Sequence, residues 1–160
     1  NNIMKIVLLV VGRTVETWLK NGIDDYVSRL GHFVPFEMQV IPELKNTKSM
    51  DTLTQKQKEG ELILKSFQAG DHIVLLDDKG AHYTSEELAT WVDKRTMQSN
   101  KRVVFVIGGP YGFSKEVYAK ANEKLSLSKM TFSHQMVRLI FVEQLYRAYT
   151  IIKGIPYHHI

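Results

Sequence analysis

The sequence contains no cysteine and no apolar run long enough to cross a membrane. The first absence excludes disulfide bonds, thiolate zinc sites and cysteine nucleophiles. The second absence excludes a membrane-spanning helix. The apolar run IVLLVV covers only residues 6–11, whereas a spanning helix needs about 20 residues. A signal-peptide pattern is also absent, because Lys5 leads into a β-branched, strand-like stretch rather than an h-region. We therefore expect a cytoplasmic protein.

Low-complexity segments, repeats and linkers are missing as well. A chain of 160 residues with 44% apolar and 24% charged residues has the size and composition of one globular domain, which we assign to residues 1–160. Residues 1–3 precede Met4. We interpret them either as an addition from cloning or as the product of an alternative start.

The net charge of +4 is concentrated near the C-terminus. Residues 120–160 hold six of the 21 Lys and Arg residues but only two of the 17 Asp and Glu residues. A local basic face suggests a phosphate-bearing partner such as a nucleic acid. The alternative is a solvated helix face, which charge alone favours.

Apolar patterning predicts an α/β fold, with a mostly parallel sheet and helices on both faces. Stretches that are apolar throughout indicate buried strands, and helical periodicity separates them along the chain. Thr84 and Glu87 form a capping-box pattern that opens one helix, and Ser114 begins a short one. The expected strands are 4–11, 34–40, 72–77, 102–108 and 125–130, and the last helix covers 134–153.

A glycine loop, IGGPYG at 107–112, follows one of these strands. In parallel sheets ligands bind at the carboxyl ends of the strands. The loop matches neither the dinucleotide fingerprint nor the P-loop. It offers a backbone that a ligand can approach closely, with free amides, although a plain tight turn is the alternative. Asp77 and Asp78 follow another strand and are candidates for an acid, a base or a metal ligand, but the sequence DKG favours a turn.

Histidine and arginine supply the remaining candidate chemistry. His134 opens the last helix, where the positive end of the helix dipole favours the neutral imidazole. Arg138 and Arg147 are nine residues apart, and we expect them to share roughly one side of the helix and to be able to grip phosphates. The alternative for Arg147 is an ion pair with Glu143. No metal-ligand spacing is present.

Three motifs resemble a known family when they are taken together and in order. They are IGGPYG (107–112), LSLSKMTFSHQMVRLIFVEQLYRAYTI (125–151) and PYHH (156–159). They are similar to the RlmH family of ribosomal large-subunit pseudouridine methyltransferases, within the SPOUT superfamily. The resemblance covers essentially the whole chain. It implies a SPOUT-type α/β fold with a C-terminal trefoil knot, a homodimer, and S-adenosyl-L-methionine as the cofactor.

The resemblance also implies a reaction and a set of site residues. The reaction is methylation of N3 of a pseudouridine in 23S rRNA within the assembled ribosome, without a metal. The implied catalytic candidates are His134, Arg147, Tyr157 and His158. The implied cofactor contacts are Leu76, Gly109, Ser128, Lys129, Met130, Thr131, Phe132 and Ser133.

Two other functions are consistent with parts of the pattern. One is a nucleotide-binding hydrolase or transferase that uses the glycine loop for phosphate, and the missing phosphate fingerprints argue against it. The other is a non-enzymatic ribosome-associated factor that docks through its basic C-terminal helix. The ordered set of motifs favours the methyltransferase over both.

Overall fold

A parallel five-stranded sheet forms the centre of the computed structural model, which describes residues 4–98 and 101–159. Residues 1–3 lie outside the described part, so the structure does not test the two interpretations of this segment. The strand order is β2-β1-β4-β3-β5, and every pairing between these strands is parallel. The predicted α/β class is confirmed. The strands are β1 (Lys5–Val11), β2 (Phe36–Ile41), β3 (His72–His82), β4 (Arg102–Ile107) and β5 (Glu123–Ser126).

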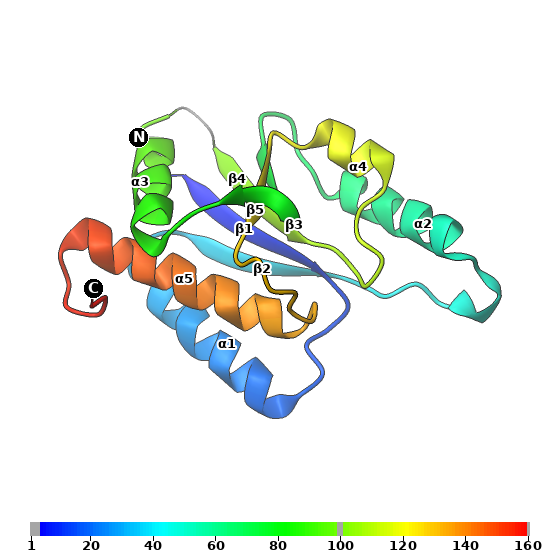
Figure 1. Ribbon diagram of the computed structural model, residues 1–160, viewed down its shortest axis with the longest axis horizontal. Coiled ribbons are helices and arrows are strands. Elements are labelled where there is room, and N and C mark those ends of the chain that lie inside the picture. The colour runs from blue at the N-terminus through cyan, green and yellow to red at the C-terminus, as the bar shows by residue number, and fades with distance from the viewer. Residues whose placement is uncertain (1–3, 99–100, 160) are drawn as a thin grey trace.

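Helices cover both faces of this sheet (Figure 1). Alternate residues of β1 explain why: Ile6 and Leu8 face one apolar cluster, and Val7 and Leu9 face the other. A strand buried on both faces requires two helical layers. One layer holds α1 (Thr17–Leu30), α3 (Ser85–Thr96) and α5 (Met136–Lys153), and the other holds α2 (Thr52–Lys65) and α4 (Lys115–Lys120). A short 3-10 helix, η1 (Thr47–Ser49), precedes α2.

Local sequence signals fix several helix ends. Thr84 and Glu87 form the predicted capping box at the start of α3, and Ser114 caps α4 through the Val117 N–H. Gly154 ends α5 in the left-handed conformation, with φ at 68°. The predicted capping box and the predicted helix start at Ser114 are confirmed.

The region around β3 and β5 differs from the prediction. β3 does not stop at Asp77 for a turn but continues to His82, with a register shift against β5 between Leu76 and Ala81. Gly80 permits this pairing, because a Cβ atom there would lie 2.5 Å from the Lys124 carbonyl carbon. β5 spans only Glu123–Ser126, so most of the predicted strand 125–130 belongs to a loop. That loop is therefore free to line a site.

Within residues 4–98 and 101–159, no helix is both long and apolar enough to span a membrane.

Candidate active site

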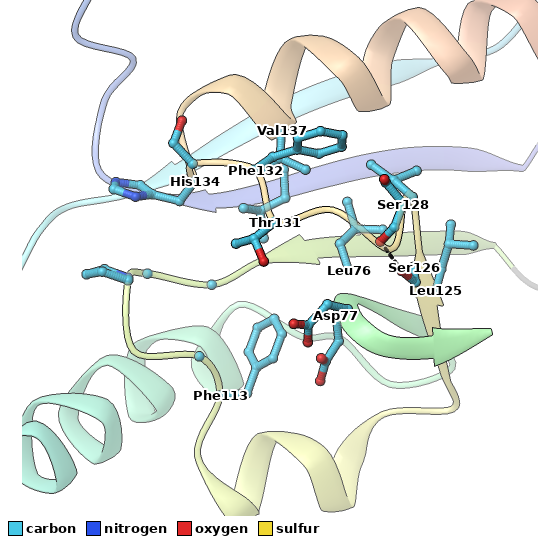
Figure 2. A pocket seen from close by; sticks show the side chains of 18 of the residues that line it. Leu76, Asp77, Phe113, Leu125, Ser126, Ser128, Thr131, Phe132, His134 and Val137 are labelled. Carbon is cyan, nitrogen blue, oxygen red and sulfur yellow. Dashed lines mark hydrogen bonds between the residues drawn. The ribbon is translucent and has the colours of Figure 1, made fainter. Parts of the chain in front are cut away.

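A cavity lies at the carboxyl ends of β4 and β5 and beside the irregular middle of β3 (Figure 2). A site at this edge of a parallel sheet is expected. Leu76 and Asp77 come from β3, the glycine loop follows β4, and the segment 125–134 contains the end of β5 and the loop after it. The cavity has a volume of about 410 Å³, which is within the range of small-molecule sites. Of the eight predicted cofactor contacts, seven line it: Leu76, Gly109, Ser128, Met130, Thr131, Phe132 and Ser133. Lys129 belongs to the same loop but is not among the lining residues.

The glycine loop forms one wall, but its amides are less free than expected. The Gly109 N–H donates to Glu59 Oε1 at 2.9 Å, and the Gly112 N–H donates to the Gly109 carbonyl at 3.2 Å. Gly112 has a positive φ of 81°, which a glycine adopts without strain. The loop is therefore a closed, internally bonded turn. The expectation that it presents free amides is wrong for these two residues.

Asp77 places a negative charge in the cavity. Partial burial raises its pKa, but hydrogen bonds from the Tyr118 hydroxyl and the Lys79 N–H outweigh this effect and hold the pKa below its usual value. The bond to Lys79 is the turn-forming contact that the sequence favoured, although it lies within the irregular part of β3. An ionised carboxylate in this position favours a cationic ligand.

His134 lies at the opposite side of the cavity, just before α5 (Figure 2). Burial and the nearby guanidinium of Arg138 lower its pKa. The predicted neutral imidazole is therefore supported, and burial and Arg138 are its causes. A neutral imidazole at a cavity wall has a free lone pair and is suited to accept a proton.

The predicted shared role of Arg138 and Arg147 is wrong. Nine residues at 3.6 per turn correspond to two and a half turns, so the two side chains leave opposite sides of α5. Arg138 is fully buried and donates to the Val11 carbonyl at 2.8 Å and to Thr14 Oγ1 at 3.1 Å. It is a structural residue that joins α5 to the end of β1 and cannot grip a phosphate.

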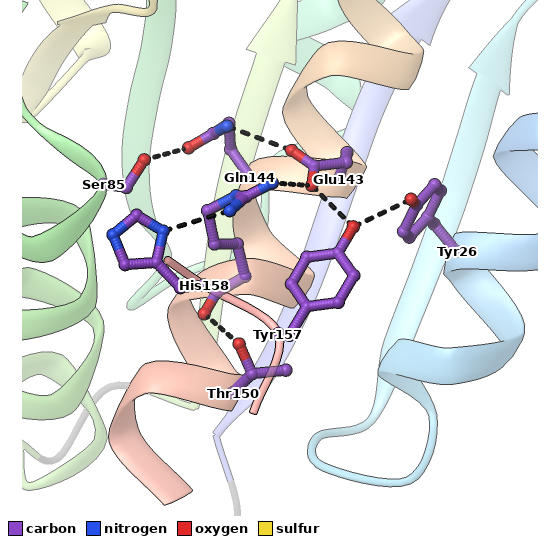
Figure 3. A network of polar contacts seen from close by, with 8 residues as sticks. Tyr26, Ser85, Glu143, Gln144, Thr150, Tyr157 and His158 are labelled. Carbon is purple, nitrogen blue, oxygen red and sulfur yellow. Dashed lines mark hydrogen bonds and ion pairs between the residues drawn. The ribbon is translucent and has the colours of Figure 1, made fainter. Parts of the chain in front are cut away.

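The other three catalytic candidates gather on the last turns of α5 and on the tail (Figure 3). Arg147 donates to Glu143 Oε2 at 2.8 Å, which confirms the predicted ion pair, and to His158 Nδ1 at 3.0 Å. Its guanidinium also lies 4.9 Å from the centre of the Tyr157 ring. A guanidinium has no acceptor, so Nδ1 of a neutral His158 must accept, and its proton must lie on Nε2.

Tyr157 is held by two further hydrogen bonds. Its hydroxyl donates to Glu143 Oε2 at 2.7 Å and accepts from the Tyr26 hydroxyl of α1 at 2.9 Å. Burial, the Tyr26 contact and the carboxylate of Glu143 raise the pKa of Tyr157, so it remains a neutral hydrogen-bonding group. The tail is thus fixed against α5 and α1.

The structure does not bring all four catalytic candidates together within one chain. Arg147 lies thirteen residues after His134, and at 1.5 Å per helical residue this corresponds to about 20 Å. His134 lines the cavity, whereas Arg147, Tyr157 and His158 do not. One chain therefore separates the candidates into two groups, hereafter the half-sites of the hypothesis: the cavity with His134, and the cluster of Arg147, Tyr157 and His158, hereafter the tail cluster.

Sequence reasoning missed two residues next to the cavity. Tyr118 of α4 lines it and fixes Asp77. Glu59 of α2 holds the glycine loop from behind. A signal for Glu59 was present, because it lies one turn before the buried Ile63 and hence on the inner face of α2.

Comparison with known proteins identifies relatives over nearly the whole chain. A family model described as "Predicted SPOUT methyltransferase" matches residues 4–158. Curated relatives named "Ribosomal RNA large subunit methyltransferase H" include those of Bacteroides fragilis at 61% identity, Phocaeicola vulgatus at 60% and Flavobacterium johnsoniae at 49%. Each alignment covers 98% of this chain and 99% of the relative.

Proposed function

This chain belongs to the SPOUT methyltransferase family, and we propose that it methylates N3 of a pseudouridine in 23S rRNA within the assembled ribosome. The methyl donor in this proposal is S-adenosyl-L-methionine. The observation that carries the proposal is the coincidence of the cavity with the family motifs quoted above: seven residues expected to contact the cofactor line one cavity. The proposed substrate, ribosomal RNA, is inferred from the names of the relatives.

The cavity suits this cofactor in shape and charge. Leu76, Met130 and Phe132 offer apolar surface for an adenine ring. The ionised Asp77 complements a cationic ligand. When bound, S-adenosylmethionine supplies an electrophilic methyl group on a positively charged sulfur. The chain itself must then bind the target base and manage the proton of its imide nitrogen.

His134 is our candidate for the general base that removes this proton. The pKa of an imide N–H lies well above neutrality, so a base beside the target nitrogen assists its removal. The lowered pKa of His134 keeps its lone pair available at neutral pH. Arg147 is our candidate for stabilising negative charge on the base oxygens, and Tyr157 and His158 are candidates for contacts to the base.

A homodimer completes this proposal. His134 and the tail cluster lie at different ends of α5, so a single chain cannot present both to one base. In a symmetric dimer, the tail cluster of one subunit would face the cavity of the other. The proposal also includes the trefoil knot that family membership implies, in which the C-terminal part of the chain threads through a loop.

A methyl-transfer assay tests the function. The protein is incubated with methyl-labelled S-adenosylmethionine and with ribosomes that carry or lack the pseudouridine. We expect labelled rRNA only when the pseudouridine is present. Tight ribosome binding without transfer would instead support the non-enzymatic factor, and preference for ATP or NAD in calorimetry would support the nucleotide-binding enzyme.

A further inference from the structure

Glu59 is a carboxylate buried behind the wall of the cavity. It lies in the middle of α2, and only 6% of its surface is exposed, although Lys58 and Glu61 on the same helix are exposed. It is not among the residues that line the cavity. Any effect on a ligand must therefore act through the residue it touches.

That residue is Gly109. The Gly109 N–H donates to Glu59 Oε1 at 2.9 Å. A Cβ atom at Gly109 would lie 2.5 Å from Glu59 Oε2 and 3.0 Å from its carboxyl carbon. Glu59 in its observed position thus leaves no room for a side chain at Gly109, and the carboxylate sets how close the loop lies to α2.

The next residue of α2, Gly60, packs closely against Ser114, which follows the glycine loop. A Cβ atom at Gly60 would overlap the hydroxyl of Ser114, which caps α4. The turn between Gly109 and Gly112 closes the segment between these two anchors. Two consecutive residues of α2 therefore contact this segment: Glu59 binds the Gly109 N–H, and Gly60 packs closely against Ser114.

Stability alone does not account for a carboxylate at this position. Burial raises the pKa of Glu59, and the Gly109 N–H compensates for only part of that effect. An apolar residue of similar volume would avoid this cost. A carboxylate retained at an energetic cost beside a ligand cavity indicates a functional role.

We propose that Glu59 is a positioning residue for the cofactor, holding the Gly109 backbone at the distance from the cavity that S-adenosylmethionine binding requires. The inference rests on the proposed function, because it concerns the affinity for that cofactor. It assigns a role in methyl-donor binding to α2, an element outside the cavity.

The test compares Glu59→Ala, Glu59→Gln and the exposed control Glu61→Ala. Cofactor affinity is measured by calorimetry with S-adenosylmethionine, and amide hydrogen exchange is followed at Gly109. We expect Glu59→Ala to weaken binding by about 10- to 100-fold, the equivalent of one hydrogen bond to a charged group. Exchange at Gly109 should accelerate even without cofactor. Glu59→Gln keeps an acceptor oxygen and should recover most of the affinity, and Glu61→Ala should match the wild type.

A double-substitution cycle gives a second measurement. Gly109→Ala alone should weaken binding, because its Cβ meets the carboxylate. In the Glu59→Ala background the added methyl group has room, so the double variant should bind no worse than Glu59→Ala. Additive losses would overturn the proposal, as would wild-type affinity in Glu59→Ala or no recovery in Glu59→Gln.

The outcomes separate this inference from the proposed function. If the wild-type protein binds no S-adenosylmethionine, the proposed function fails and the cofactor role of Glu59 fails with it. If the wild type binds and the Glu59 variants bind equally well, only the positioning role fails.

Discussion

His134 combines exposure to the cavity with a lowered pKa, and both features follow from its surroundings. The imidazole is partly buried, and the guanidinium of Arg138 lies near it. Both effects disfavour the protonated ring. His134 therefore stays neutral down to a pH below the usual histidine value of about 6.5.

His134→Ala should slow methyl transfer by about 100-fold or more, the usual contribution of a general base. Affinity for S-adenosylmethionine should change little. In the wild type, the acidic fall in rate should occur below the usual histidine pKa, because the pKa of His134 is lowered. Single-turnover rates at saturating cofactor and varied pH measure both effects. His32→Ala, an exposed control in the turn after α1, should behave as the wild type. Unchanged turnover in His134→Ala would remove this residue from the mechanism.

Arg138 shows how a residue that suggests nucleic-acid binding can be structural. Replacing it by Met removes the donors to the buried Val11 carbonyl and to Thr14. We expect a loss of about 3 kcal/mol in the free energy of unfolding, because buried acceptors are left unpaired. Urea denaturation measures the change. Arg29→Met, which breaks a surface ion pair with Asp25 and cation–π contacts with Tyr26 and Tyr146, should lower the free energy of unfolding clearly less than Arg138→Met. Equal losses in the two variants would contradict the structural role of Arg138.

At the scale of elements, the contact between β3 and β5 positions one side of the cavity. The backbone of β5 passes so close to Gly80 that a Cβ atom would lie 2.6 Å from the Leu125 nitrogen. Backbone atoms cannot move aside as a flexible side chain can. The irregular part of β3 thus depends on this glycine, and with it the placement of the loop that follows β5.

Gly80→Ala should therefore destabilise the protein by about 2 kcal/mol or more and weaken cofactor binding. Gly22→Ala is the matched control, since its Cβ would make an ordinary 3.4 Å contact with Leu139. That substitution lies inside α1 and should stabilise by up to about 1 kcal/mol. Thermal unfolding and calorimetry measure the two effects. A harmless Gly80→Ala would show that the strand pairing has another origin.

The elements also show what the sequence could and could not predict. Thr84–Glu87 and Ser114 encode helix starts locally, and unbroken apolar runs encode buried parallel strands. The continuation of β3 beyond Asp77 was not predictable in this way, because it depends on Gly80 meeting a strand more than forty residues later. The role of Glu59 likewise depends on a long-range contact. The cavity residues were identified by resemblance to a family, whereas residue spacing alone gave only a ligand loop.

At the scale of the whole molecule, the separation of the two half-sites along α5 is the main argument for the proposed homodimer. The cavity contains His134, and the tail cluster contains Arg147 locked to Glu143 and His158. Each half-site is well formed by itself. An active site shared between two subunits would combine the half-site of one subunit with that of the other, without rearranging the residues of either half-site.

Mixing two inactive variants tests this arrangement. Dimers of His134→Ala and dimers of Arg147→Ala should each be nearly inactive. After subunit exchange, a mixed dimer has one site with both residues intact, so an equal mixture should regain about a quarter of the wild-type rate. Methyl-transfer assays before and after exchange measure the recovery. No recovery in a mixture shown to contain mixed dimers would contradict the shared site.

The central claim, that this chain methylates N3 of a pseudouridine in assembled ribosomes, is tested most directly by identifying the product nucleoside. Ribosomes and naked 23S rRNA are each incubated with the protein and S-adenosylmethionine, and the digested RNA is analysed by mass spectrometry. We predict N3-methylpseudouridine from the ribosomes and far less of it from naked rRNA. A methyl group on any other nucleoside, or equal modification of naked rRNA, would contradict the account.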